Sequence, residues 1–359
     1  MKKLHYSVME NLEKPNVLMQ VNGHNLLEFK KSKTIFETPK IEGLYSYIYE
    51  SFEPSKHIKY FKEPQPSLYP IDLNVGLEKA CPVINSRIAT RLHMPLNFAM
   101  KDSTTYQRPT TATTVYTSRR VLTLLMEFCY GKYNSHVLVS RHNGNLYMAG
   151  DPAADMDTPQ QFHHKRLEQC LFADSPDELP KMDQPIDMNI ALSCLHHAYL
   201  GKFSLLYAGE VQGIISDKML ENINDMDLLN QCRFVFSKQM WEWSKKEYKF
   251  LRYWIQSRLS NVDDIYVACK DKEGIVKKPI EHCKVSDIPK NYPWEPEVCF
   301  GFLHAFLEKV ENLMHGVNSL ETVYEFQLNP PTKKITYEIY NGRTDKTFIP
   351  KYYADFVNN

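Results

Sequence analysis

The sequence lacks an excess of charge of either sign, because 43 Lys and Arg residues balance 43 Asp and Glu residues among 359. A formal net charge of zero gives no global electrostatic reason to bind nucleic acid, so any basic surface must be local. The chain also has no apolar run that approaches a membrane span, and residues 1–14 lack the apolar core of a signal peptide. We therefore expect a soluble, intracellular protein.

Clustered cysteines are also missing, because the eight cysteines are scattered and form no CxxC pair or His/Cys group. They are Cys81, Cys129, Cys170, Cys194, Cys232, Cys269, Cys283 and Cys299. Most of them lie in apolar runs, as expected of reduced core cysteines in a cytosolic or nuclear protein. The hydrophobic content of 43% and the aromatic content of 12% indicate a packed globular chain rather than a disordered one.

Helical and strand patterns are interleaved along the chain without a strict strand–helix–strand repeat. Apolar spacing and capping residues predict helices at 118–130, 158–173, 185–199, 239–259 and 296–315. Alternating apolar runs predict hairpins at 136–149 around Asn143-Gly144, at 264–278 and at 321–340. The Thr-rich segment 104–117 is interpreted as a surface loop. This order predicts an α+β fold in which mixed sheets are flanked by helices.

Two β-prone runs near the middle of the chain carry polar residues among apolar ones. The first run contains Glu210 and Gln212, and the second contains Phe236 and Lys238. Because side chains alternate along a strand, Glu210 and Gln212 share one side of their strand, as do Phe236 and Lys238 on theirs. A Glu and a Lys on neighbouring apolar strands suggest a hydrolytic metal site, but the carboxylates are too few to complete one.

Residues 118–340 resemble the decapping exonuclease family known as DXO, through motifs that follow one another in the order found in that family. The motifs are an Arg before an LT-x-L run, a Glu in a GYKFEQY-like helix, G-E-V-D and E-x-K on consecutive strands, and a Gln in a KLLKWWAQSFL-like helix. In this chain their positions are held by Arg119, Glu168, Glu210, Gln212, Phe236, Lys238 and Gln256. A WNPSVC-like helix start is matched by WEPEVC at 294–299. Any one match alone would be weak, but the ordered set makes the resemblance specific.

The resemblance implies a single domain, 1–359, with two twisted mixed β-sheets flanked by helices, a divergent part at 1–117 and a motif-bearing core at 118–340. Members of that family bind Mg²⁺ or Mn²⁺ in a ring of carboxylates. They remove incomplete or noncanonical caps, including NAD, and then degrade the RNA from its 5′ end.

This chain departs from the family pattern at two metal-binding positions, because Gln212 stands where the family has Asp and Phe236 where it has Glu. Gln brings no negative charge and Phe no ligand atom. Loss of a residue that only supports a metal ligand costs roughly 10–100-fold in metal affinity or activity, and loss of two ligands should cost more. We therefore predict a catalytically inactive member without a resident cofactor. Glu168 and Glu210 are remnants that hold Mg²⁺ or Mn²⁺ only if the residual site still binds metal.

The retained Arg119, Lys238 and Gln256 are candidates for RNA contact. The favoured hypothesis is a nuclear factor that binds RNA 5′ ends or recruits a chromatin-bound or transcription-termination protein, as in degenerate insect members of the Cutoff type that protect piRNA precursors. One alternative is an active, metal-dependent decapping enzyme and 5′→3′ exoribonuclease that uses Glu168 and Glu210. Another is a pure interaction scaffold whose old cleft is filled by Phe236. No membrane partner is expected.

Other conspicuous residues have plainer interpretations. Neighbouring helical side chains point about 100° apart, so we do not expect a shared ion between His163 and His164. Core-edge packing is favoured for His196 and His197, and a solvated loop for Asp217, Glu221, Asp225 and Asp227. The aromatic residues Trp241, Trp243, Tyr248 and Trp254 are predicted to be mostly core. Basic residues beside them that are available to RNA phosphates are Lys245, Lys246 and Arg252.

Overall fold

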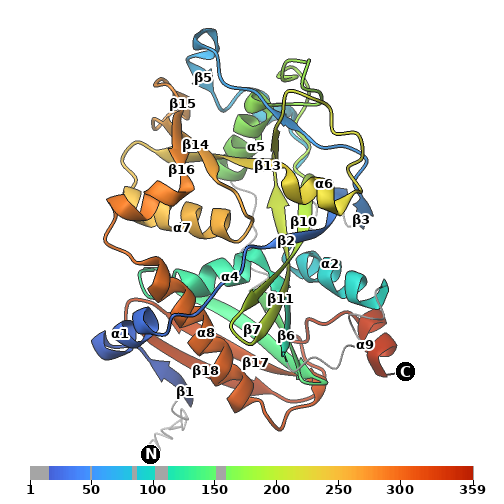
Figure 1. Ribbon diagram of the computed structural model, residues 1–359, viewed down its shortest axis with the longest axis vertical. Coiled ribbons are helices and arrows are strands. Elements are labelled where there is room, and N and C mark those ends of the chain that lie inside the picture. The colour runs from blue at the N-terminus through green and yellow to red at the C-terminus, as the bar shows by residue number, and fades with distance from the viewer. Residues whose placement is uncertain (1–15, 49–50, 83–86, 102–111, 151–158, 359) are drawn as a thin grey trace, which may run out of the picture.

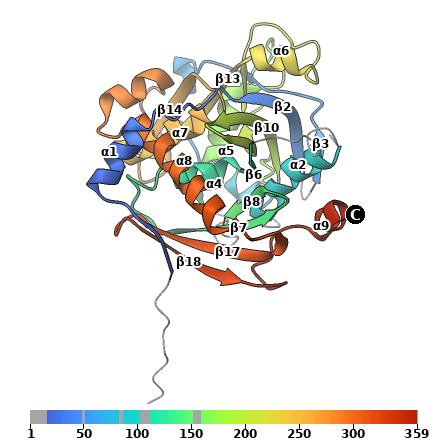
Figure 2. The same cartoon turned by 60° about the horizontal axis from the view of Figure 1, so that its bottom comes forward.

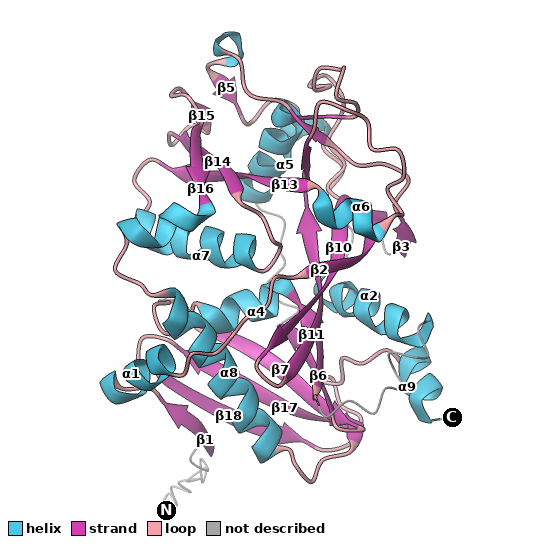
Figure 3. Cartoon of the chain, in the orientation of Figure 1, coloured by secondary structure: helices cyan, strands magenta, loops and turns pink. Residues whose placement is uncertain are grey.

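The computed structural model describes residues 16–48, 51–82, 87–101, 112–150 and 159–358, in which two large mixed sheets are surrounded by helices (Figures 1 and 3). The ten-stranded sheet has the order β1 (Asn16–Gln20), β18 (Lys334–Tyr340), β17 (Ser319–Asn329), β7 (Ser135–His142), β8 (Asn145–Gly150), β6 (Thr114–Ser118), β11 (Phe203–Val211), β10 (Ile190–Leu200), β2 (Lys40–Ile48) and β3 (Ser51–Pro54). The six-stranded sheet has the order β16 (Glu281–Lys284), β14 (Asp264–Lys270), β13 (Arg233–Trp241), β12 (Gly213–Ile215), β4 (Tyr60–Phe61) and β9 (Phe172–Ala173). A small third sheet pairs β15 (Ile275–Val276) with β5 (Ile71–Asp72).

The helices in the described part of the chain are α1 (Gly23–Lys31), α2 (Arg87–Lys101), α4 (Arg119–Met126), α5 (Pro159–Leu171), α6 (Met226–Gln231), α7 (Lys246–Arg258), α8 (Pro296–Leu313) and α9 (Lys351–Asn358). None of them combines the length and the apolar character needed to cross a bilayer. One core cluster joins α4, α7 and α8 to strands of both large sheets, with Leu122, Leu251 and Phe302 among its helical members. The predicted α+β class with two large mixed sheets is confirmed.

The chain passes from one large sheet to the other at Gln212, between the end of β11 and the start of β12. The backbone N–H of Ile214 donates to the carbonyl of Lys59 at 2.9 Å, which holds the crossing segment tightly against its neighbour. A Cβ on Gly213 would collide with that same carbonyl, so only glycine fits this position. The crossing point therefore has a fixed backbone, and it carries one of the motif residues.

Several sequence predictions are confirmed. The Asn143-Gly144 turn joins β7 to β8 with φ values of 47° and 77°, as the type I′ hairpin requires. The predicted helices at 158–173 and 296–315 correspond to α5 and α8, although Thr158 lies outside the described residues. The last hairpin forms between β17 and β18, and Figure 2 shows this pair lying below α8.

Other predictions are wrong. The segment 185–199, read as a helix, contains strand β10, which pairs with β11 on one side and β2 on the other. The predicted helix 239–259 begins only at Lys246, because the residues up to Trp241 continue β13 alongside β14. The turn predicted within 264–278 forms at Gly274, but β15 pairs with β5 in another sheet rather than with β14. In the Thr-rich segment, 114–117 belongs to strand β6 and 104–111 lies outside the described residues.

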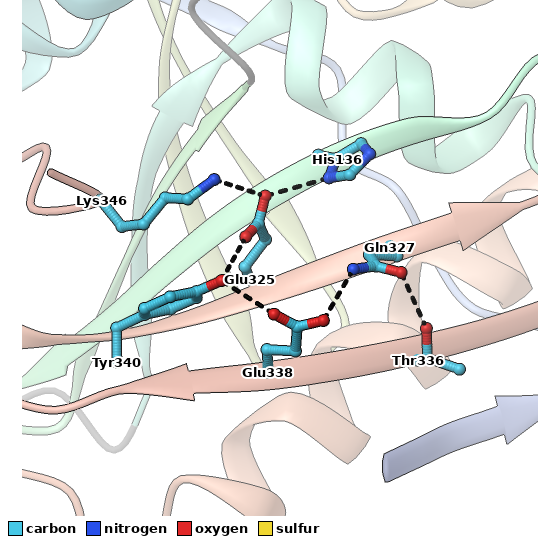
Figure 4. Close-up of polar contacts among 7 residues, drawn as sticks. All are labelled: His136, Glu325, Gln327, Thr336, Glu338, Tyr340 and Lys346. Carbon is cyan, nitrogen blue, oxygen red and sulfur yellow. Dashed lines mark hydrogen bonds and ion pairs between the residues drawn. The ribbon is translucent and has the colours of Figure 1, made fainter. Parts of the chain in front are cut away.

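The segment after β18 is tied to the ten-stranded sheet by a polar network around Glu325 (Figure 4). One carboxylate oxygen of Glu325 accepts hydrogen bonds from Lys346 and from Nδ1 of His136, both at 3.0 Å. The Tyr340 hydroxyl lies 3.1 Å from the other oxygen and 2.8 Å from a carboxylate oxygen of Glu338. Burial alone would raise the pKa of Glu325, but the hydrogen bonds from Lys346 and His136 outweigh burial and lower it. The network therefore stabilises the ionised carboxylate.

Candidate functional site

A cavity of about 510 Å³ is lined by all seven motif residues predicted from the sequence. Arg119 comes from α4, Glu168 from α5, Glu210 from β11, Gln212 from the crossing between the sheets, Phe236 and Lys238 from β13, and Gln256 from α7. The wall residues that sequence reasoning did not place in the site include His164, Lys165, Lys249 and Tyr253. His164 and Lys165 precede Glu168 on α5 by four and three residues, so their helical spacing was the signal that could have found them.

The amide of Gln212 is fixed to strand β13. Its Oε1 accepts a hydrogen bond from the Ser237 backbone N–H at 2.6 Å, and its Nε2 donates to the Ser237 hydroxyl at 2.9 Å. Nε2 also lies 3.4 Å from Nε2 of His164. The backbone pairing of β12 with β13 ends at Gly213 and Val235. The side-chain amide of Gln212 continues this pairing to Ser237 with its own two hydrogen bonds. At 5% exposure Gln212 acts here as a structural bridge, and its oxygen is already occupied.

The ring of Phe236 faces two cations. Its centroid lies 4.5 Å from Nζ of Lys238 and 5.1 Å from Cζ of Arg119, distances at which a cation is attracted to the face of a ring. The ring is 2% exposed and belongs to the large core cluster. Where the DXO pattern has a carboxylate, this chain therefore offers the two cations a neutral partner.

Lys238 lies buried in the cavity wall, with 8% of its surface exposed. Its ammonium donates to Oε1 of Gln256 at 2.8 Å and lies 5.7 Å from the ring centre of Tyr253. It forms no ion pair with a carboxylate in the part of the chain that the structure describes. Burial, reinforced by Arg119 and opposed by Glu210, lowers the pKa of Lys238 to about 7. At neutral pH the group is therefore poised between its charged and neutral forms, and a bound anion would favour the charged form.

Arg119 is held between β11 and the end of α7. Its Nη1 donates to the Ser260 hydroxyl at 2.6 Å. A Cβ on Gly209 would lie 3.2 Å from three atoms of the arginine side chain, so the glycine allows β11 to pass close to it. This packing aims the guanidinium toward Phe236 and the cavity.

Basic side chains outnumber carboxylates among the described residues that line the cavity, six to two. The basic residues are Arg119, Arg120, Lys165, Lys238, Lys249 and Arg252, and the acidic ones are Glu168 and Glu210. Lys165 lies 3.5 Å from Glu168, and Nε of Arg252 donates at 2.9 Å to Glu127. Burial, together with Lys238, lowers the pKa of His164 to about 3, so the imidazole adds no charge at neutral pH. The described wall is cationic overall.

The donor atoms of the wall fit a divalent cation poorly. Mg²⁺ and Mn²⁺ prefer several oxygen ligands, of which carboxylates are the strongest. Among the residues that the structure describes, no three His, Cys, Asp or Glu side chains gather where they would hold an ion. Gln212 has its amide engaged with Ser237, and Phe236 has no donor atom.

The histidine pairs, the acidic segment and the aromatic group noted in the sequence occupy different parts of the structure. His164 lines the cavity, whereas His163 contacts Lys270 and Asn74 on the other side of α5. His196 is fully buried and stacks on Tyr207, and His197 contacts the Ser204 hydroxyl at 2.9 Å. The four acidic residues are exposed and are not among the wall residues, namely Asp217, Glu221, Asp225 and Asp227. The loop prediction is wrong for Asp227, which lies in the first turn of α6, and Asp225 is the N-cap of that helix. The aromatic group divides, because Trp254 is core but Trp243 is 62% exposed, which corrects the prediction for Trp243.

The fold and the ordered motif positions define a nuclease fold of the kind whose signature places an acidic residue two positions before a lysine, here replaced by Phe236-Ser237-Lys238. The chain belongs to the family of RAI1-like PD-(D/E)XK nucleases, whose family model matches residues 37–354. This finding confirms the family predicted from the sequence.

Two curated proteins and a solved structure illustrate what the chain is similar to. It is 22% identical to the decapping and exoribonuclease protein Rai1 of Drosophila melanogaster, over 82% of this chain and 84% of that protein. It is 23% identical to the protein cutoff of the same organism, over 95% and 94% of the two chains. The crystal structure of Candida albicans Rai1 in complex with pU5 and Mn²⁺ matches with a TM-score of 0.72 at 16% identity, covering 96% of this chain and 98% of that one, which shows a shared fold.

Proposed function

We propose that this protein binds the 5′-phosphorylated end of RNA in the cavity without hydrolysing it. The observation that carries the proposal is the charge of the described cavity wall, where six basic side chains face two carboxylates. Such a wall attracts a phosphate directly, whereas a hydrolytic site of this family needs carboxylates that gather metal ions. Retention of the cations and loss of the ligands favour binding over cleavage.

Lys238 and Arg119 are the residues to which we assign the phosphate. Both contact the ring of Phe236, so a phosphate beside that ring would meet two cations at once. Binding a phosphate would raise the lowered pKa of Lys238 and complete its charge. Gln256 holds the lysine ammonium at 2.8 Å and acts as its positioning residue.

Two relatives support the proposal. Candida albicans Rai1 was crystallised with pU5 and Mn²⁺, which places a 5′-phosphorylated RNA on a protein of this fold. The protein cutoff matches nearly the whole chain. On that likeness we further propose a nuclear role in which the protein protects transcripts or recruits a chromatin-bound or transcription-termination protein.

The alternative of an active metal-dependent decapping enzyme and exoribonuclease rests on Glu168 and Glu210, which both line the cavity. The scaffold alternative required Phe236 to fill the old cleft. Phe236 instead forms part of the wall of a cavity of about 510 Å³, which leaves room for a ligand.

The binding test compares RNAs that differ only at the 5′ end, measured in EDTA. We expect the 5′-monophosphate RNA to bind at least about tenfold more tightly than the 5′-hydroxyl RNA, because charge-assisted bonds to a buried site give such differences. Arg119→Ala and Lys238→Ala should remove this preference. Lys218→Ala, at an exposed lysine outside the cavity wall, is the matched control. Equal affinity for the two RNAs would contradict the proposal.

The turnover test uses 5′-triphosphate, NAD-capped and 5′-monophosphate RNAs with Mn²⁺. We expect no cleavage by the wild-type protein. Metal-dependent cleavage that disappears in Glu210→Ala would instead establish the active alternative.

A further inference from the structure

A pair of stacked tryptophans, called the platform below, lies outside the cavity, with Trp241 at the end of β13 and Trp243 on the turn that follows it. The rings of Trp241 and Trp243 have centroids 5.0 Å apart and planes 15° apart. Trp243 is 62% exposed, although a side chain of this size usually buries most of its surface. One large aromatic face is therefore presented to solvent on a supported ring.

The inner side of the stack is held rigidly. Trp241 pairs with Lys270 in the β13–β14 ladder, and the N–H of Glu242 donates to the Lys270 carbonyl at 3.0 Å. Nζ of Lys270 lies 4.0 Å from the centroid of the Trp241 ring and 2.6 Å from Nδ1 of His163. His163 also meets the Trp241 ring edge to face at 6.4 Å. The platform is thus preorganised by a strand pair, a buried cation and a helix.

Lys270, which lies beneath the Trp241 ring, stays protonated and cationic at neutral pH. Burial and the neighbouring Lys270 lower the pKa of His163 to about 4, so the imidazole is neutral and accepts a hydrogen bond through Nδ1. Burial lowers the pKa of Lys270 to about 8, which leaves its ammonium charged at neutral pH. A cation under the inner ring strengthens the platform and adds positive charge beside a polyanion.

Strand β13 and the start of α5 connect the platform to the cavity. Trp241 follows Gln239 by two residues on β13, and Gln239 lines the cavity and contacts the Gln160 carbonyl at the start of α5. Two residues of an extended strand span roughly 7 Å. A strand of RNA that leaves the cavity in this direction therefore reaches the indole within its first few nucleotides.

We propose that Trp243 is a stacking platform for a nucleobase of the RNA strand whose 5′ phosphate occupies the cavity, an inference that rests on the proposed function. Lys245 and Lys246 follow Trp243 by two and three residues and are exposed, so the chain next to the ring offers cations to a phosphate backbone. The one acidic residue between the two tryptophans, Glu242, pairs with Lys278 at 3.3 Å. Stacking tolerates any base, because every base has an aromatic face.

The experiment measures affinity for a 5′-phosphorylated oligouridylate of about ten nucleotides, a length within the usual single-strand site size. Trp243→Ala should weaken binding roughly five- to hundredfold, the range found when one base-stacking aromatic is removed, and Trp243→Phe should retain most of the affinity. The same RNA with abasic sites after its first nucleotide should bind wild type and Trp243→Ala equally. Tyr352→Ala, at an exposed aromatic of α9 that does not line the cavity, is the control and should bind normally.

The outcomes separate this inference from the proposed function. If Trp243→Ala binds like wild type while Arg119→Ala and Lys238→Ala lose the 5′-phosphate preference, the platform is wrong and the function stands. If binding depends on Trp243 and not on the cavity residues, the function is wrong and the platform stands. Failure of the wild-type protein to bind any of these RNAs overturns both.

Discussion

Two buried charges lie along strand β13, and only one of them is paired with side chains of opposite charge. At the beginning of β13, Asp264 of the neighbouring strand is fully buried and receives Arg233, His282 and Lys284, each with an N···O distance of 2.6 Å. Burial would raise the pKa of Asp264, but the hydrogen bonds from Lys284, His282 and Arg233 outweigh burial and lower it to about 2. Further along β13, Lys238 is almost as buried, but its ammonium contacts Gln256 and aromatic rings and forms no ion pair with a carboxylate among the described residues.

This difference in partners distinguishes Asp264, whose charge serves the structure, from Lys238, whose charge can serve a ligand. A buried ion is tolerated when its partners belong to the protein, and the site at Asp264 is complete in this sense. The cavity keeps its cations but has Gln212 and Phe236 at two positions where the family pattern has carboxylates, so we propose an external anion as the partner of Lys238. Changing the charge at either site therefore tests the comparison.

The largest effect is expected at the complete site. Asp264→Asn should lower the free energy of unfolding by about 3–5 kcal/mol at neutral pH, because it leaves Arg233, His282 and Lys284 without their charge partner. Chemical denaturation measures this change. Because the folded pKa of Asp264 lies below its ordinary value of 3.8, the stabilisation is present above that value and is lost as the pH falls toward about 2. A loss below 1 kcal/mol at neutral pH would contradict the structural role.

An intermediate effect of opposite sign is expected at the incomplete site. Lys238→Met should raise the free energy of unfolding by roughly 1–4 kcal/mol at neutral pH, because it removes a buried charge that forms no ion pair with a carboxylate among the described residues. The lysine has a pKa of about 7 in the folded chain and an ordinary value of 10.5. Above pH 7 the unfolded chain binds the extra proton, so the wild-type protein gains stability as the pH rises toward 10.5 and the advantage of the variant shrinks.

The same variant should lose the preference for 5′-phosphorylated RNA, which would show that stability has been sacrificed for binding. The control is Lys218→Met, because Lys218 is exposed and lies outside the cavity wall. A Lys238→Met protein that is less stable than wild type at neutral pH would contradict this comparison, because it would show that the charge of Lys238 is stabilised within the folded protein.

The features that could be predicted from the sequence are those that depend on residues close together in the chain. The Asn143-Gly144 turn follows from the conformations those two residues tolerate, and the motif positions follow from ordered short patterns. Strand β10 was missed because both of its sides are largely buried, which removes the alternation that marks a half-buried strand. The bridge from Gln212 to Ser237 joins residues that only the fold brings together. The exposure of Trp243 was unpredictable because tryptophan in an apolar stripe usually indicates core.

The smallest effect, and the sharpest test, comes from giving the cavity the charge it lacks. Phe236→Glu places a carboxylate beside Lys238 and Arg119, which lie 4.5 Å and 5.1 Å from the centre of the present ring. The new carboxylate should raise the pKa of Lys238 and compete with the RNA phosphate for both cations. We expect the preference for 5′-phosphorylated over 5′-hydroxyl RNA, measured in EDTA, to fall about tenfold, equivalent to roughly 1.4 kcal/mol.

Phe236→Gln is the matched control, because it disturbs the same packing without adding charge. If the Glu and Gln variants bind the two RNAs alike, the phosphate does not meet these cations, and the contrast between the two sites on β13 is structural only. If only the Glu variant loses the preference, its carboxylate has taken the place of the ligand, and the cavity has become a closed charge site like that at Asp264. The anion that completes the site in the wild-type protein would then be the 5′ phosphate.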